Sequence, residues 1–106
     1  MPTTNAPQNP TTTWQIYLGL HIPGSAEVVS DKVFAGFLAA TVVPHFESFT
    51  VTDGLGYWRG RAEPVKVLTI ITTDGHRIKH VAESYKAQYD QEAVLVNALP
   101  SFPTLL

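Results

Sequence analysis

Apolar and polar residues alternate strictly from Trp14 to Ile22, so that every second side chain is apolar. A period of two is typical of a β-strand that buries one face. Further apolar or alternating segments predict three more strands, at residues 48–53, 65–73 and 92–99. The strands at 65–73 and 92–99 are apolar on both faces. We therefore expect something to cover both faces of the sheet that they join.

Two other segments follow the helical period instead. The first can begin at Ser30 or Asp31 and ends before Pro44, and the second can begin at Asp74, because each of these side chains can accept a hydrogen bond from a free helix N–H group. The apolar stripes of the two helices are expected to comprise Phe34, Phe37, Leu38, Thr41 and Val42, then Ile78, Val81, Ala82, Tyr85 and Tyr89.

The predicted order is β-α-β-β-α-β. Since crossover connections are right-handed, both helices are expected on the same face of the sheet. We predict a ferredoxin-like α+β sandwich with a four-stranded antiparallel sheet and two helices on one face. The other face is left bare, and we expect a second copy of the chain to cover it, which predicts a homo-oligomer. The alternative cover is the C-terminal tail, through Phe102, Leu105 and Leu106.

Length and composition limit the classes of function that the chain can have. The chain has 106 residues, enough for one domain, which we place at 13–106. Residues 1–12 are polar and proline-rich and are expected to form a disordered tail rather than a secretory signal. The net charge of −2 argues against nucleic acid, no segment is long and apolar enough for membrane insertion, and the absence of cysteine fits a cytoplasmic protein.

The stretch after the second strand carries the strongest candidate site. We expect residues 54–61 to form a loop whose glycines expose backbone N–H groups and whose arginines bind an anion. Its aromatic rings offer flat faces to a ligand or to a neighbouring subunit. The alternative is a hairpin whose aromatics pack on a second subunit and whose arginines pair with Glu63 or another acid. The predicted ligand-binding residues are Thr52, Gly54, Gly56, Tyr57, Trp58, Arg59, Gly60, Arg61 and His21.

Other candidate chemistry is sparse. His76 and His80 lie four residues apart on a predicted helix, a spacing that can bind zinc, but no third ligand is evident, so we predict neither a metal site nor a cofactor. No nucleophile motif supports covalent catalysis. An enzyme hypothesis stays open: a dimeric α+β barrel that encloses an apolar pocket, with His21 and Tyr17 facing it.

The order of elements, with Thr50-Val51-Thr52-Asp53 followed by Gly56 and Arg59, resembles the PII-like signalling superfamily, in which such a stretch opens the long T-loop. The resemblance implies homotrimers that bind ligands in the clefts between subunits. Here the T-loop is drastically short, and "YDQEAV" stands where PII proteins have a phosphate-binding loop. Standard ATP binding is therefore not expected.

Small PII-like proteins associated with carboxysomes are similar, which implies a non-enzymatic regulatory protein with an unknown protein partner. Its ligand would be ADP, AMP or bicarbonate. A closer resemblance, through "VSDKVFAGF", "FTVTDGLGYWRG" and "YKAQYDQEAVL", is to an uncharacterised bacterial domain-of-unknown-function family, and it spans Tyr17 to Leu95.

Overall fold

The predicted α+β architecture is confirmed. A computed structural model describes residues 10–106, and the expected tail lies outside this range except for its last three residues. The elements are β1 (Thr11–Gly19), α1 (Asp31–Phe37), the π-helical segment η1 (Leu38–Val42), β2 (Thr50–Trp58), β3 (Arg61–Ile71), α2 (Gly75–Gln88) and β4 (Leu95–Ser101). Within the described range, no helix combines the length and the hydropathy needed to span a membrane.

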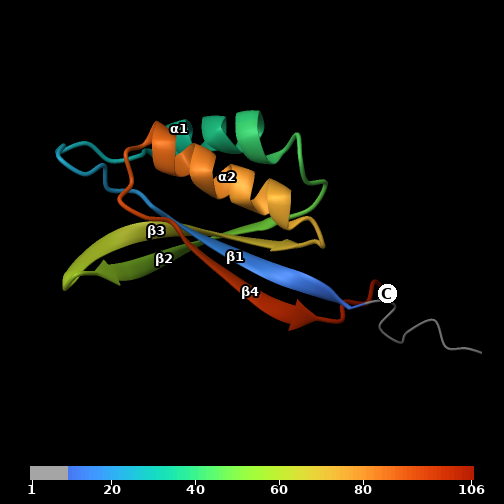
Figure 1. Cartoon of the computed structure of the whole chain (residues 1–106). Coiled ribbons are helices and arrows are strands. Elements are labelled where there is room, and N and C mark those ends of the chain that lie inside the picture. Colours follow the sequence, from blue (N-terminus) through green and yellow to red (C-terminus); the bar gives the residue numbers. More distant parts are fainter. Residues whose placement is uncertain (1–9) are drawn as a thin grey trace, which may run out of the picture.

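The four strands form one antiparallel sheet in the order β2-β3-β1-β4. Both helices lie on the same face of this sheet (Figure 1). This is the ferredoxin-like sandwich, in which β1 and β3 occupy the centre and β2 and β4 form the edges. Gln15 on β1 marks the register, since it lies opposite Thr69 of β3 and Asn97 of β4.

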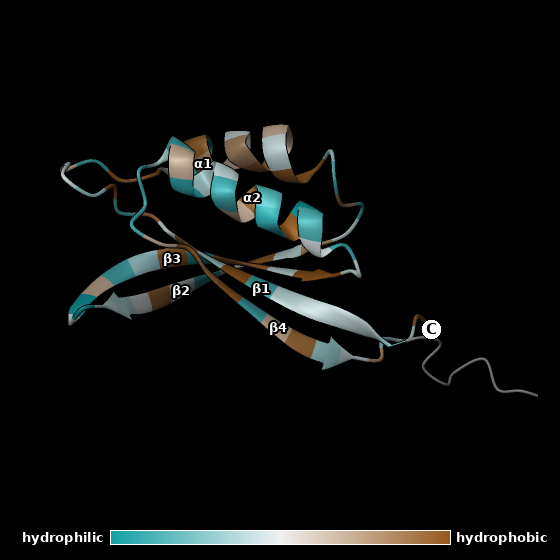
Figure 2. Ribbon diagram, in the orientation of Figure 1, coloured by the Kyte–Doolittle hydropathy of each residue, from teal (hydrophilic) through white to brown (hydrophobic). Residues whose placement is uncertain are grey.

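The core lies between the sheet and the helices. Alternate residues of the two central strands are completely buried, among them Ile16 and Leu68. The helices contribute an aromatic cluster in which the ring of Tyr85 packs edge-on against Phe37, with 5.1 Å between centroids. The other core residues are Leu18, Leu20, Val29, Phe34, Val42, Phe46, Ile70, Ile78, Val81 and Ala82. Figure 2 shows that the hydrophobic positions of α2 alternate with hydrophilic ones along the helix, as expected for a one-sided helix.

The helix starts agree with the sequence. Ser30 is the N-cap of α1, and its hydroxyl accepts a hydrogen bond from the Val33 N–H. Asp74 caps α2 in the same way through the Arg77 N–H. The first helix then widens into η1, where the Val43 N–H donates to the Leu38 carbonyl five residues back.

One ion-pair group lies on the helix side of the sheet. The Lys66 ammonium of β3 contacts Asp53 of β2 and lies 3.2 Å from Asp31 at the start of α1. Hydrogen bonds to Asp53 and Asp31 raise the pKa of Lys66 above its ordinary value of 10.5. This group ties the first helix to the edge of the sheet.

Several boundaries differ from the prediction. β1 begins at Thr11 and ends at Gly19, because the chain beyond it turns and forms only an isolated bridge between His21 and Val28. β4 occupies 95–101 rather than 92–99. The C-terminal tail does not cover the sheet, as the 61% exposure of Phe102 and the nearly complete exposure of the last two leucines show.

Candidate functional site

The glycine-rich stretch is a hairpin, not a loop. β2 continues through Trp58, and β3 begins at Arg61, so only two residues form the turn. Arg59 and Gly60 have φ values of 51° and 78°. Positive φ at both central residues is typical of the type I′ turn, whose twist matches that of the flanking strands. The prediction of a loop from Gly54 to Arg61 was therefore wrong.

Gly54 and Gly56 serve the packing of the hairpin. A β-carbon on either residue would lie 3.2 Å or 3.0 Å from the side chain of Val65 on the neighbouring strand. Their backbone is extended, so they supply close approach rather than positive φ. Thr52 lies on the same strand opposite Val67, roughly 20 Å from the turn at about 3.3 Å per residue. Thr52 is therefore not gathered with the residues of the turn.

The tip of the hairpin contacts the segment before β4. The Trp58 indole N–H donates to one oxygen of Glu92 at 3.1 Å, and the Arg59 guanidinium pairs with the other at 2.6 Å. The Arg59 guanidinium also lies 5.5 Å from the centroid of the Trp58 ring. Arg61 forms no ion pair within residues 10–106, and Tyr57 is 72% exposed. The predicted alternative, in which an acid neutralises an arginine, thus holds for Arg59.

Three residues from the end of β1, the start of β3 and the loop after α2 form what we call the acceptor cluster: Gly19, Glu63 and Gln91. A β-carbon on Gly19 would lie 2.9 Å and 3.1 Å from the two Glu63 carboxylate oxygens and 3.0 Å from the Gln91 Oε1. Three acceptor oxygens therefore converge on the position above Gly19, where no side chain is present. Glu63 and Gln91 are half-buried.

The Glu63 carboxylate lacks a partner in the described part of the chain, where it neither accepts a hydrogen bond nor forms an ion pair. The orientation of the Gln91 amide is fixed, because its Nε2 donates to the carbonyls of His21 and Tyr89. Its Oε1 therefore faces the same space as the Glu63 carboxylate. A half-buried carboxylate without a donor is costly, so the cluster is suited to a ligand that brings donors.

Tyr85 supports the cluster from the core. Its hydroxyl donates to the Gly19 carbonyl at 2.6 Å, which holds the end of β1 in place. Burial raises the pKa of the Tyr85 phenol well above its ordinary value of 10.0, with smaller contributions from Tyr89 and Glu63. The phenol therefore stays protonated and keeps donating.

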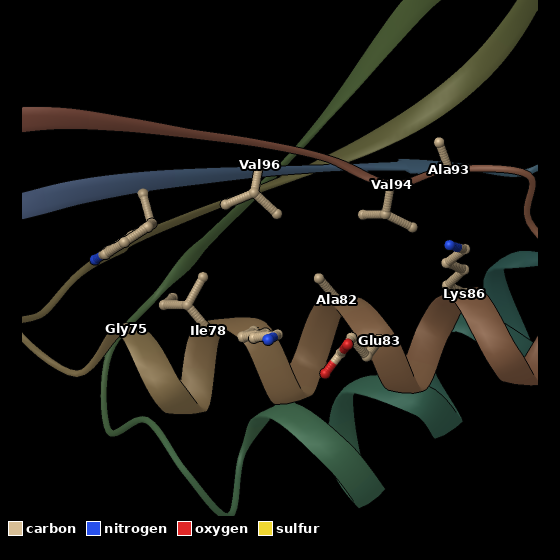
Figure 3. A pocket seen from close by; sticks show the side chains of 10 residues that line it. Gly75, Ile78, Ala82, Glu83, Lys86, Ala93, Val94 and Val96 are labelled. Carbon is tan, nitrogen blue, oxygen red and sulfur yellow. The ribbon is translucent and has the colours of Figure 1, made fainter.

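His21 and Tyr17 are not brought into a common pocket. The Tyr17 hydroxyl donates to Gln15 on the face of the sheet away from the helices. His21 lies beyond the end of β1, where its carbonyl accepts from Gln91. A groove of about 350 Å³ lies between α2 and β4, where Figure 3 shows Lys86 and Glu83 beside Val94 and Val96. Neither His21 nor Tyr17 lines it.

The paired histidines are exposed. The His80 ring lies 5.2 Å from that of His45, which follows η1. Residues 10–106 contain no group of three or more side chains placed to hold a metal ion. The arrangement is that of a solvated aromatic contact.

Sequence comparison places the chain in a family. A family model described as "Protein of unknown function (DUF3574)" matches residues 13–102. The chain belongs to the DUF3574 family. The earlier resemblance to a domain-of-unknown-function family agrees with this result, whereas the finer assignment to PII-like proteins stays a prediction. No curated protein matches the chain.

The DUF3574 chain also resembles a solved structure. The fold is similar to that of a phage SAM lyase in complex with S-methyl-5′-thioadenosine, with a TM-score of 0.55. The match has 15% sequence identity and covers 88% of this chain and 90% of that one. At this identity the likeness shows a shared fold.

Sequence reasoning missed most of the acceptor cluster. It mentioned Glu63 only as a partner for the arginines, and it treated Gln91 as part of a segment replacing a phosphate loop. One signal was present, since Gly19 interrupts an otherwise regular strand, and a strand glycine often marks close approach of another group. The sequence around Glu63 carries no pattern that distinguishes this residue from a solvent-exposed acid.

Proposed function

We propose that the acceptor cluster binds a small molecule that carries hydrogen-bond donors and no phosphate, of the nucleoside type. The observation that carries this proposal is the convergence of the Glu63 carboxylate and the Gln91 Oε1 over Gly19, with no donor from residues 10–106 on the carboxylate. A carboxylate accepts well from two adjacent hydroxyl groups, such as those of a ribose. Charge-assisted hydrogen bonds of this kind are about twice as strong as neutral ones.

An aromatic surface lies beside the cluster. The Trp58 side chain reaches Glu92, which is the sequence neighbour of Gln91. Trp58 is 48% exposed and lies on the same side of the hairpin as Glu63, so its ring is accessible to a planar base, whereas Tyr57 lies on the opposite side. Stacking of a base on an aromatic ring, together with carboxylate contacts to the sugar, is sufficient to recognise a nucleoside.

The structural neighbour supports the choice of ligand class. That phage protein was solved with S-methyl-5′-thioadenosine, a nucleoside that is neutral and has a ribose diol. We extend the ligand class to this chain as part of the proposal, and we do not extend the lyase activity.

The charges near the cluster argue against phosphate. Glu92 already neutralises Arg59, and the Glu63 carboxylate would repel a phosphate group. The PII-like resemblance implies ADP, AMP or bicarbonate as the ligand. Binding of such an anion would therefore depend on the positive charge of Arg61. The regulatory role and the trimer that the same resemblance implies stay predictions.

The test is thermal unfolding of the full chain with S-methyl-5′-thioadenosine, adenosine, ADP, AMP, ATP or bicarbonate. A ligand that binds only the folded protein stabilises it by about 2.7 kcal/mol at roughly a hundredfold excess over its dissociation constant. We expect a shift with the two nucleosides that Glu63→Gln weakens by roughly tenfold in affinity or more, since it removes the charge and keeps the size. Glu47→Gln, a change at an exposed acid elsewhere, serves as the control.

The outcomes separate the hypotheses. If only the nucleotides or bicarbonate raise the midpoint, and Arg61→Ala abolishes the effect while Glu63→Gln does not, the anion-sensor hypothesis replaces this proposal. If no compound shifts the midpoint, the proposed ligand class is wrong. Chromatography of the nucleosides after incubation would reveal turnover, which a binding protein does not produce.

A further inference from the structure

No element of residues 10–106 covers the face of the sheet opposite the helices (Figure 1). Because paired residues of antiparallel strands point to the same side, the strand register defines the side chains on this face. At the hairpin end, this side of the sheet also carries Gly19, Trp58, Arg61 and Glu63. We call the remaining residues the open sheet face: Thr13, Gln15, Tyr17, Thr50, Thr52, Gly54, Gly56, Val65, Val67, Thr69, Ile71, Leu95, Asn97, Leu99 and Ser101.

The open sheet face so defined carries no charged residue, and Arg61 and Glu63 border it at the hairpin end of the sheet. Three of its large apolar side chains are strongly exposed in the single chain: Ile71 at 52%, Leu95 at 63% and Leu99 at 45%. The outer side of α2, by contrast, exposes Lys79, Glu83 and other charged groups. An uncharged face with several exposed aliphatic side chains is typical of a surface that is covered in the working protein.

The polar side chains that β1 and β4 place on this face already bond to one another. The Gln15 Oε1 accepts from the Tyr17 hydroxyl at 3.1 Å and from the Asn97 amide at 3.4 Å. The hydroxyls of Thr13 and Ser101 share a hydrogen bond across β1 and β4. Covering the β1–β4 part of the face would therefore leave few donors or acceptors without partners, which lowers the cost of removing water there.

These observations identify the occupant. Contact with the charged side of α2 of another chain would bury Lys79 and Glu83 against an uncharged surface, at a high desolvation cost. The tail of the same chain does not cover the face, since Phe102, Leu105 and Leu106 are exposed. Two open sheet faces, however, match each other in both charge and hydrophobicity.

We propose that the open sheet face is covered by the open sheet face of a second copy of this chain, packed sheet on sheet. Side chains from two such faces interdigitate at a sheet separation of about 10 Å. Gly54 and Gly56 keep the β2 side of the face low, which lets the partner approach. The acceptor cluster borders the open sheet face on the same side of the sheet. The inference does not depend on the nucleoside proposal, because its test changes Leu95 and Leu99 and uses a different measurement.

The test is the mass of the full chain in solution, measured by light scattering after size exclusion across a wide range of concentrations. One chain has a mass of 11.6 kDa, and we expect a multiple of this value. Leu95→Lys should shift the mass to that of the monomer, because it places a charge in the interface. Leu55→Lys is the matched control, since Leu55 is 67% exposed and lies on the opposite face of β2.

Circular dichroism verifies that both variants fold, and Leu99→Lys provides a second interface variant. A monomeric wild-type chain at every concentration would overturn the proposal. So would an oligomer that Leu95→Lys and Leu99→Lys leave intact, or one that Leu55→Lys disrupts equally. A sedimentation measurement without a column would detect an oligomer that dissociates during dilution.

Discussion

At the scale of single residues, Gly19 has the largest influence on the candidate site. Its missing side chain leaves room for the Glu63 carboxylate and the Gln91 amide oxygen, and its carbonyl anchors the buried Tyr85 hydroxyl. The sequence shows a glycine in a strand but cannot show what approaches it, because Glu63 and Gln91 are 44 and 72 positions away along the chain.

Gly19→Ala should disturb the site and spare the fold. The new methyl group would meet only the ends of two flexible side chains, which can turn away, so we expect the free energy of unfolding to change by less than about 1 kcal/mol. The displaced oxygens would no longer converge, and the nucleoside-induced rise in the unfolding midpoint should disappear. Urea unfolding and thermal shift on the same preparation check both statements. A normal ligand response in this variant would exclude the acceptor cluster as the binding site.

At the scale of elements, local sequence determined the helix starts and the order of the elements along the chain correctly. Ser30 and Asp74 cap the helices as predicted, since a cap needs only a side-chain oxygen next to free N–H groups. The hairpin was mispredicted because three glycines close together suggest a loop, whereas two of them are extended residues that pack against Val65. Only the pairing of β2 with β3 distinguishes these two uses of glycine.

Two Gly→Ala changes should have opposite effects. Neither Gly60 nor Gly36 has an atom within 4 Å of the place a β-carbon would occupy, so backbone conformation alone decides. Gly60 has a φ of 78°, and alanine there should cost about 1–2 kcal/mol. Gly36 lies in α1, where alanine should stabilise the protein by about 0.5–1 kcal/mol. Urea unfolding measures both; equal effects would contradict the assignment of the turn.

At the scale of the whole molecule, stability should fall at high pH. The pKa values of Lys66, Tyr85 and Tyr89 are all raised in the folded protein, so each group holds its proton more tightly when folded. Their contributions are complete below the ordinary values of 10.0 for tyrosine and 10.5 for lysine, and they are lost as the pH rises through the folded values. The urea midpoint should therefore decrease from about pH 9 to about pH 11.

A pair of tyrosine variants tests this cause. Tyr85→Phe removes the buried phenol and should flatten part of the decrease, while it lowers stability at neutral pH by about 1–2 kcal/mol because the Gly19 carbonyl loses its donor. Tyr57→Phe changes an exposed ring and should leave the pH profile unchanged. Identical profiles for the two variants would mean that Tyr85 does not contribute.

The sequence by itself determined the fold class, the helix caps and most of the core, because periodicity and capping depend on neighbours within one or two turns of the chain. It also indicated the bare, apolar face of the sheet. Only the tertiary structure decided where the strands end, that the glycine-rich stretch is a hairpin, and that Gly19, Glu63 and Gln91 meet. Each of these depends on contacts between residues distant in sequence, and local pattern carries no record of which distant residue fills a given space.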